Sequence, residues 1–284
     1  MRRTIGIAAF VLALTVLAVL LLALRQGVRI SLPAISSWRH VTFGAPGSLY
    51  HGAGSAPAQG IRQVSVQAPT VGSVQVTTSP GSRVTWHWTV ARAHQGVMSS
   101  AVAGGVLTLT FAPPASVQWN IGAMPDVLNV NVPPGLTANV SVTTGGATLS
   151  GTYRAVTANV TTGPLSIRDF RGRLSGGVVT GPLNAQAIEA EGPLRLEVGT
   201  GPLNFSGDPG LDSSFSVGTG PLNLALSPRG SLAVEAAAHL GPMNSGFPTL
   251  SGGTNGVFSG TIGQGPSGTL TVEDGTGPVS ITPQ

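Results

Sequence analysis

Three acidic side chains that could carry catalysis lie close together in the sequence. Glu189 and Glu191 are two residues apart, which places both on one side of a strand, and Glu197 follows in the next segment. Paired carboxylates are the acid and base, or acid and nucleophile, of glycoside-cleaving enzymes. The ten acidic residues are otherwise spread out, and Arg195 adds a neighbouring opposite charge. A solvated strand face is therefore the favoured interpretation, with a carbohydrate-active enzyme as the alternative.

The densest charged stretch runs from 168 to 173 and reads Arg-Asp-Phe-Arg-Gly-Arg. We predict that it forms an exposed loop in which the aspartate offsets one arginine. Arg168, Arg171 and Arg173 are then candidate contacts for an anionic glycan or a lipid headgroup, because clustered positive charge attracts such ligands. The alternative is a soluble loop with no ligand.

Several other kinds of chemistry are excluded by residue types that the chain lacks. All 14 basic residues are arginine, and there is no cysteine. Lysine nucleophiles, a P-loop lysine, disulfides and thiolate metal sites are therefore ruled out. The five histidines show no metal-ligand spacing, and neither a Gly-x-Ser-x-Gly nor a His-Glu-x-x-His motif occurs. We expect no catalytic residue, no metal and no cofactor.

The net charge of +4 is unevenly divided along the chain. Residues 1–125 hold eight arginines and no acid, whereas residues 126–284 hold six arginines and ten acids. A nucleic-acid-binding face needs clustered basic residues, usually with stacking aromatics, and these arginines are scattered. We therefore expect no nucleic-acid partner.

The elements that position these residues begin with an apolar segment at the N-terminus. Residues 5–24 carry no charge and would span roughly 30 Å as a helix, the thickness of a bilayer core. Arg2 and Arg3 precede this segment, and Arg25 and Arg29 follow it. We predict a tail over 1–4 and an uncleaved transmembrane anchor over 5–24, with the body outside the cytoplasm. A cleaved signal peptide is the alternative, but the apolar run is long for one.

Between the anchor and the body we predict a juxtamembrane segment and linker over 25–60. Residues 44–60 are small, polar and rich in Gly, Ala and Pro, a composition typical of flexible linkers.

Residues 61–134 alternate between apolar and polar types, which predicts a lead-in of half-buried strands. Within Val84–Val90, Trp86 and Trp88 should fill the core, while His87 between them points the other way.

From 135 to 284 the chain repeats a Gly-Pro-Leu-Asn unit at a period near 20. The motif glycines Gly163, Gly181, Gly201, Gly220 and Gly241 are 18 to 21 residues apart. Short alternating segments at such a period are typical of a solenoid, so we predict an all-β solenoid (β-helix) of seven or eight coils. Glycine and proline should mark one corner of each coil.

The other motif positions should then stack from coil to coil. An internal apolar column is predicted from Leu165, Leu183, Leu203, Leu222, Met243 and Val279. An amide ladder is predicted from Asn184, Asn204, Asn223 and Asn244. A second polar ladder is predicted from Thr144, Thr162, Thr180, Thr200, Thr219 and Thr276. Stacked identical polar side chains stabilise cross-β arrangements.

The step Val132-Pro133-Pro134-Gly135, followed by Val140 and Thr143-Thr144-Gly145, resembles a bacterial adhesin-like domain family of unknown function. The resemblance covers about 61–284 and extends to membrane-anchored Lia-G-like proteins of cell-envelope stress loci. It implies a β-solenoid fold and an envelope surface protein, and it brings no catalytic residue.

Together these observations predict a single-pass membrane protein whose extracytoplasmic body acts as an adhesin-like envelope interaction, scaffold or stress-related module. An envelope protein or a glycan is the expected partner. The alternatives are a carbohydrate-active β-helix enzyme and a glycan-binding module. The strand-like end at Val279–Ile281 should leave an open edge on the last coil.

Overall fold

The computed structural model describes residues 49–68, 72–91, 98–111, 126–252 and 256–284. The chain divides into two units, Met1–Val41 and Thr42–Gln284, and the described residues all belong to the second. The predicted tail over 1–4, the anchor over 5–24 and the linker up to residue 48 lie outside the described residues. In the described part of the chain, no helix is long and apolar enough to cross a membrane.

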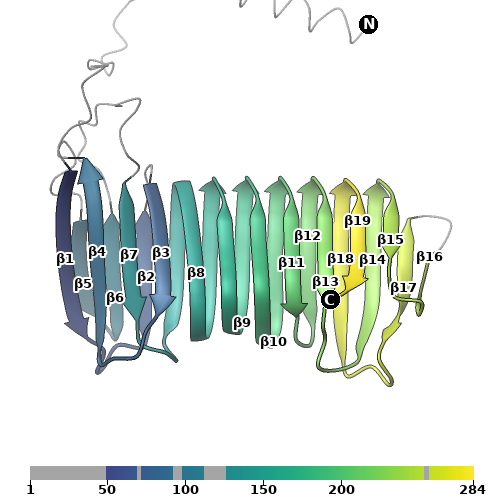
Figure 1. Ribbon diagram of the computed structural model, residues 1–284, viewed down its shortest axis with the longest axis horizontal. Coiled ribbons are helices and arrows are strands. Elements are labelled where there is room, and N and C mark those ends of the chain that lie inside the picture. The colour runs from purple at the N-terminus through teal and green to yellow at the C-terminus, as the bar shows by residue number, and fades with distance from the viewer. Residues whose placement is uncertain (1–48, 69–71, 92–97, 112–125, 253–255) are drawn as a thin grey trace, which may run out of the picture. The chain divides into compact units, whose positions relative to one another are not determined.

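The described residues form an all-β structure in which every strand joins one sheet of 19 strands (Figure 1). The strands are β1 (Leu49–Pro57), β2 (Gln63–Ala68), β3 (Gly72–Thr78), β4 (Arg83–Ala91), β5 (Met98–Ala103), β6 (Val106–Phe111), β7 (Val127–Val132), β8 (Thr137–Thr162), β9 (Leu165–Thr180), β10 (Leu183–Thr200), β11 (Leu203–Asp208), β12 (Ser213–Thr219), β13 (Leu222–Leu226), β14 (Leu232–Leu240), β15 (Met243–Ser245), β16 (Leu250–Gly252), β17 (Val257–Ile262), β18 (Gly268–Thr276) and β19 (Val279–Pro283).

The predicted strands of the lead-in are confirmed, because their apolar residues are buried at every second position. In β6 and β7, for example, fully buried side chains alternate with half-buried ones. Trp86 is 5% exposed and Trp88 packs against the core, while His87 is exposed, as the alternation of β4 predicts.

Residues 49–57 of the predicted linker form β1, so that part of the prediction is wrong. β1 pairs with β4 along its whole length, with Gly52 opposite Trp88 and Gly54 opposite Trp86. A Cβ atom on either glycine would overlap the facing indole ring. The small residues that suggested flexibility therefore make room for the two tryptophans.

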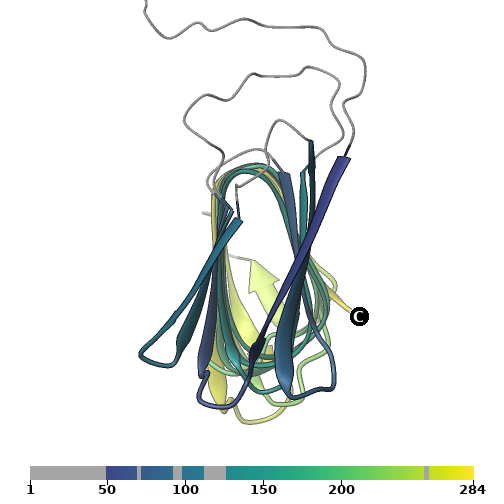
Figure 2. The same ribbon diagram turned by 90° about the vertical axis from the view of Figure 1, so that its left-hand side faces the viewer.

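Viewed end-on, the strands fall into two walls that face each other across the core (Figure 2). The first wall contains β1, β4, β7, β3, β11, β13, β19 and β15, and the second contains β6, β2, β12, β18 and β14. The long strands β8, β9 and β10 bend and contribute to both walls. Parallel pairing connects most neighbours, so equivalent residues of successive strands lie side by side.

The predicted apolar column lies inside the first wall, in an order that differs from the sequence. Leu165, Leu183, Leu203 and Leu222 are successive pairing partners and are fully buried. The next partner of Leu222 is Val279, and half-buried Met243 follows it.

The motif glycines stack at one corner between the two walls. Gly163, Gly181, Gly201 and Gly220 have φ between 134° and 140°, a region that residues with a side chain rarely adopt. A Cβ atom on any of them would overlap the carbonyl oxygen of the preceding glycine in the stack. At the opposite corner the register of β10 shifts between Ala185 and Ile188 and between Ala190 and Leu194, so differences in repeat length are absorbed there.

The last two strands of the chain lie inside the sheet, not at its end. β18 pairs with β12 on one side and β14 on the other, and β19 lies in the same way between β13 and β15. In Figure 1 the yellow β18 and β19 separate these greener strands. The predicted open edge at Val279–Ile281 is therefore wrong.

Antiparallel pairs lie toward both ends of the sheet. β1 and β5 pair antiparallel with β4 and β6 at one end, and β17 pairs antiparallel with β14 and β16 at the other. Short or antiparallel end strands hinder further parallel stacking.

Candidate functional site

The outward side of the first wall carries a row of uncharged polar side chains, which we call the polar face. Its members lie on neighbouring strands and pair in register. They are His87, Asn129, Gln75, Thr148, Ser166, Asn184, Asn204, Asn223, Ser280 and Asn244. A parallel second row contains Thr85, Asn131, Thr77 and Ser150 and continues through Arg168. Apart from Ser166, whose Oγ is buried, the rows therefore present closely spaced hydroxyl and amide groups with one arginine among them.

Three of the four predicted ladder asparagines are hydrogen-bonded to each other. The Asn204 Nδ2 donates to Asn184 Oδ1 at 2.8 Å, and the Asn223 Nδ2 donates to Asn204 Oδ1 at 2.9 Å. Asn244 does not join them, because Ser280 of the inserted β19 lies between it and Asn223. The threonines 162, 180, 200, 219 and 276 pair in register as expected, and Leu240 occupies the next position.

A shallow hollow of about 140 Å³ opens on the polar face over β10, β11, β13 and β19. Its polar lining includes Gln186, Asn204, Asn223, Ser280 and Thr282. The hollow offers hydrogen-bond donors and acceptors together, the groups that recognise an uncharged hydroxyl-bearing ligand.

The amide ladder gives a first testable prediction. Asn204→Ala removes both ladder hydrogen bonds and should lower the free energy of unfolding by about 1–2 kcal/mol. Urea denaturation of the variant and the wild type measures the difference. Asn244→Ala is the matched control, since Asn244 is exposed and stands apart from the ladder. Equal losses in both variants would mean that the ladder does not stabilise the sheet.

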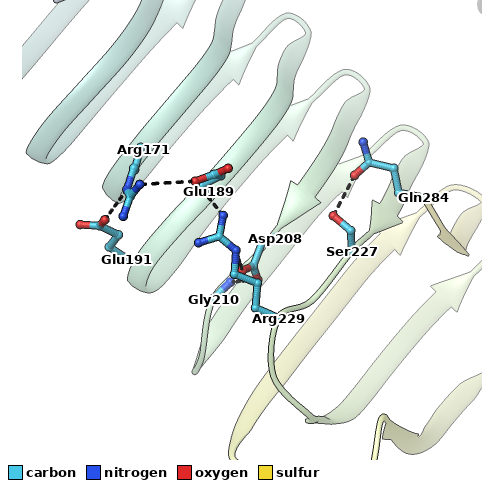
Figure 3. Close-up of polar contacts among 8 residues, drawn as sticks. All are labelled: Arg171, Glu189, Glu191, Asp208, Gly210, Ser227, Arg229 and Gln284. Atoms are coloured by element: carbon cyan, nitrogen blue, oxygen red, sulfur yellow. Dashed lines mark hydrogen bonds and ion pairs between the residues drawn. The ribbon is translucent and has the colours of Figure 1, made fainter.

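Five charged residues form a second cluster at the corner opposite the glycines (Figure 3). Arg171 Nε contacts Glu191 Oε1 at 2.5 Å, and its Nη1 is 4.0 Å from Glu189 Oε2. Arg229 bridges Glu189 at 2.7 Å and Asp208 at 3.6 Å. The cluster thus joins β9, β10, β11 and the segment after β13.

These contacts favour the charged forms of Glu189 and Arg171. The hydrogen bond and charge of Arg229 hold the pKa of Glu189 below its usual range, and the hydrogen bond to Glu191 raises the pKa of Arg171. A general acid needs a raised pKa, so Glu189 is poorly suited to that role. Glu197 pairs instead with Arg195 of its own strand at 2.7 Å.

The loop predicted over 168–173 is wrong, because these residues belong to β9. Phe170 and Gly172 point inward, and the exposed Arg171 and Arg173 alternate with them. A positive φ of 48° at Asp169 marks the corner where the strand turns between walls. Consequently Arg171 is engaged by two glutamates, and Arg168 lies in the second row of the polar face. Ligand binding by Arg168, Arg171 and Arg173 stays a prediction.

Among the residues that the structure describes, no group of three or more His, Asp or Glu side chains could hold a metal ion.

Sequence reasoning missed a buried carboxyl group at Asp274. This side chain is 1% exposed and neither oxygen has a hydrogen-bond partner. It points inward between Val217 and Ala238. Burial raises the pKa of Asp274. The Thr276 backbone N–H, which faces the carboxyl without making a regular hydrogen bond, and the charge of His239 oppose that rise.

The raised pKa predicts that stability falls as pH rises. The folded state holds the Asp274 proton more tightly than the unfolded state, so the free energy of unfolding should decrease once the pH exceeds the ordinary value of 3.8. Asp274→Asn should abolish this decrease and be about 1–3 kcal/mol more stable than the wild type at neutral pH. Urea denaturation from acid to neutral pH measures it. Glu273→Gln, which alters the exposed neighbour, should retain the decrease, and an unchanged decrease in Asp274→Asn would contradict the assignment.

No protein-family model matches the sequence, and no curated protein matches it either. Among solved structures, a "putative adhesin" from Bacteroides fragilis is similar with a TM-score of 0.44 and 10% identity over 85% of this chain and 100% of that one. A "putative cell adhesion protein" from Clostridium sporogenes is similar with a TM-score of 0.39 and 11% identity, over 84% of this chain and 100% of that one. A "putative lipid binding protein" from Parabacteroides distasonis is similar with a TM-score of 0.30 and 11% identity, over 81% of this chain and 96% of that one. Similarity at this level supports no inference for this chain, and the resemblance to an adhesin-like family stays a prediction.

Proposed function

We propose that the chain is a membrane-anchored, extracytoplasmic β-solenoid of a non-enzymatic, adhesin-like kind that binds an envelope partner through its polar face. The parallel pairing of residues 18 to 20 positions apart supports the solenoid. The apolar segment over 5–24 supports the anchor.

The binding role rests on where the charged side chains lie: the polar face lacks carboxylates, and the candidate catalytic glutamates belong to the cluster of Arg171, Glu189, Glu191, Asp208 and Arg229 or pair with Arg195. The polar face keeps rows of amides and hydroxyls free of carboxylates over many strands. The glutamates considered for catalysis are instead bound to arginines elsewhere. A surface of this kind suits an uncharged, extended partner such as a neutral glycan chain better than it suits bond cleavage.

Binding and turnover can be tested together with the full-length chain in detergent. We expect it to co-sediment with a neutral polysaccharide and to release no new reducing ends. Asn223→Glu, which puts a carboxylate on the polar face, should weaken that binding. Ser214→Glu is the matched control, because Ser214 is half-buried on the second wall.

Two results would count against this proposal. Equal binding by Asn223→Glu and Ser214→Glu would exclude the polar face as the site. Polysaccharide cleavage that is lost in Glu189→Gln or Glu191→Gln would favour the alternative of a carbohydrate-active enzyme.

The anchor is tested by deleting residues 2–24. We expect the full chain to stay in the membrane fraction after alkaline extraction and to be cleaved by protease added outside the cell. The deleted form should leave the membrane fraction. Retention of the deleted form, or protection of the full chain from external protease, would contradict the proposed anchor or its orientation.

The role in the envelope is tested by removing residues 61–284 while keeping the anchor. A scaffold or stress-related module should alter the envelope-stress response or surface attachment when its body is lost. No change in either would count against this role.

A further inference from the structure

The strand pair β18–β19 fills a slot that the rest of the sheet already defines on both sides. β12 and β13 form one side of the slot, and β14 and β15 form the other. These sides precede the inserted pair in the sequence, so the pair must enter between strands that are made before it. Neither strand of the insert pairs with the strand that precedes or follows it in the sequence.

The two sides of the slot carry the same motif, and the two copies of the motif are in register with each other. Gly220-Pro221-Leu222-Asn223 lies on one side and Gly241-Pro242-Met243-Asn244 on the other. The insert supplies Gly277-Pro278-Val279-Ser280 between them, and the Gly220 and Gly277 N–H groups donate to Thr276 and Leu240 carbonyl oxygens at 2.9 Å. A strand pair therefore fits the slot if its backbone pairs in register with both sides and its apolar residues alternate with polar ones. The same segment of a second copy meets both conditions.

The insert is held by buried apolar side chains and by a contact at its end. Leu270, Val272, Val279 and Ile281 are at most 1% exposed. At the C-terminus the Gln284 N–H donates to Leu226 O at 3.0 Å, and Ser227 Oγ donates to Gln284 Oε1 at 3.0 Å (Figure 3). All of these contacts would be identical if the insert came from another copy.

Two features make the insert easier to remove than a regular strand pair. Asp274 buries a carboxyl group without a hydrogen-bond partner in a row that is otherwise apolar, from Val178 through Val198 to Val217. The connection from β17 is the exposed turn 263–267, which contains two glycines of positive φ and a proline. Such a turn can serve as the hinge of an exchanged segment.

We propose that β18–β19 is an exchangeable insert, so that the strand pair of one copy fills the slot of a second copy and links the two chains. Because the contacts are the same within and between chains, the intramolecular form is favoured only by the effective concentration that the short connection provides, on the order of millimolar. Exchange is therefore expected when full-length chains fold together at high concentration.

The absence of native cysteine permits a direct test. One batch of full-length chain carries Asn223→Cys and a second, differently tagged batch carries Ser280→Cys, two outward residues paired in register between β13 and β19. The batches are unfolded, mixed at high concentration, refolded, diluted and oxidised. We expect a disulfide between the two tags, identified by mass spectrometry, in an amount that rises with the concentration during refolding.

The matched control uses Asn184→Cys and Asn204→Cys, which are paired in register between β10 and β11 on the same face. Neither strand belongs to the insert, so this mixture should give clearly less interchain disulfide. An amount for Asn223→Cys with Ser280→Cys no greater than this control would overturn the proposal.

A second arm keeps the proposal testable if refolding is inefficient. Folded batches are mixed without unfolding, with and without Asp274→Asn in both. Interchain disulfide should form slowly in the parent mixture and more slowly with Asp274→Asn, because the amide removes the cost of a buried carboxylate. Equal rates in the two mixtures, or no interchain disulfide in either arm, would contradict an exchangeable insert.

Discussion

Gly201→Ala is expected to lower the free energy of unfolding by about 4 kcal/mol, or to prevent folding, because two penalties combine at this residue. Its φ is 138°, which costs a residue with a side chain strain energy. The new Cβ atom would also overlap the carbonyl oxygen of Gly181, the stacked glycine at the corner between β9 and β10. The neighbour cannot move away independently, because Gly181 N–H donates to Thr200 O at 2.9 Å.

Gly135→Ala is the control that separates the two penalties. Gly135 also has a positive φ of 82°, but nothing lies within 4 Å of the Cβ position. Its substitution should cost only the strain, about 1–2 kcal/mol. Chemical denaturation followed by circular dichroism measures both variants. Similar losses for Gly201→Ala and Gly135→Ala would mean that the stacked corner does not restrict the side chain.

Leu203→Ala should cost about 2–5 kcal/mol, the range for deleting a buried leucine side chain when the surroundings relax only in part. Leu203 is fully buried and pairs with Leu183 on one side and Leu222 on the other. Backbone hydrogen bonds to both neighbours keep their side chains from filling the cavity. Hydrogen exchange should show the largest loss of protection in β10, β11 and β13.

Leu240→Ala provides the same substitution without the burial. Leu240 is 69% exposed, so its loss should change stability by less than about 0.5 kcal/mol. If Leu203→Ala were no more destabilising than this control, the apolar column would not form the core.

The local elements could be predicted from sequence because each repeat carries its own physical signals. The alternation of apolar and polar residues predicts the strands of the lead-in. Glycine followed by proline predicts the corner at which Gly163, Gly181, Gly201 and Gly220 stack. Leu165 to Leu222 were assigned to the interior from the same spacing, and the structure buries them.

The spatial order of the last strands could not be read from the repeat itself. Gly241 and Gly277 begin equivalent motifs, so either could follow Gly220 with the same local contacts. In the structure β17 pairs antiparallel with β14 and occupies its outer side. β18 therefore pairs with β14 on the side that faces β12, which separates Asn244 from the other ladder asparagines.

The candidate site was partly accessible to sequence reasoning. The asparagine ladder follows from the repeat, whereas Glu189 and Arg229 are far apart in sequence and meet only because β10, β11 and β13 lie side by side. Asp274 could have been found, because alternation from Leu270 and Val272 points residue 274 inward. β1 was missed because its small residues lack the β-branched signal of a strand.

The two corners of the sheet differ in how they would accept foreign sequence. At the glycine corner the backbones of successive glycines are in close contact, so an inserted residue there would shift the register of the strands that follow. The opposite corner already absorbs different numbers of residues at Ala185–Ile188 and Ala190–Leu194. Peptide epitopes or affinity tags grafted at that corner should be displayed at regular intervals without disturbing the stack, which suits the chain to use as a multivalent scaffold.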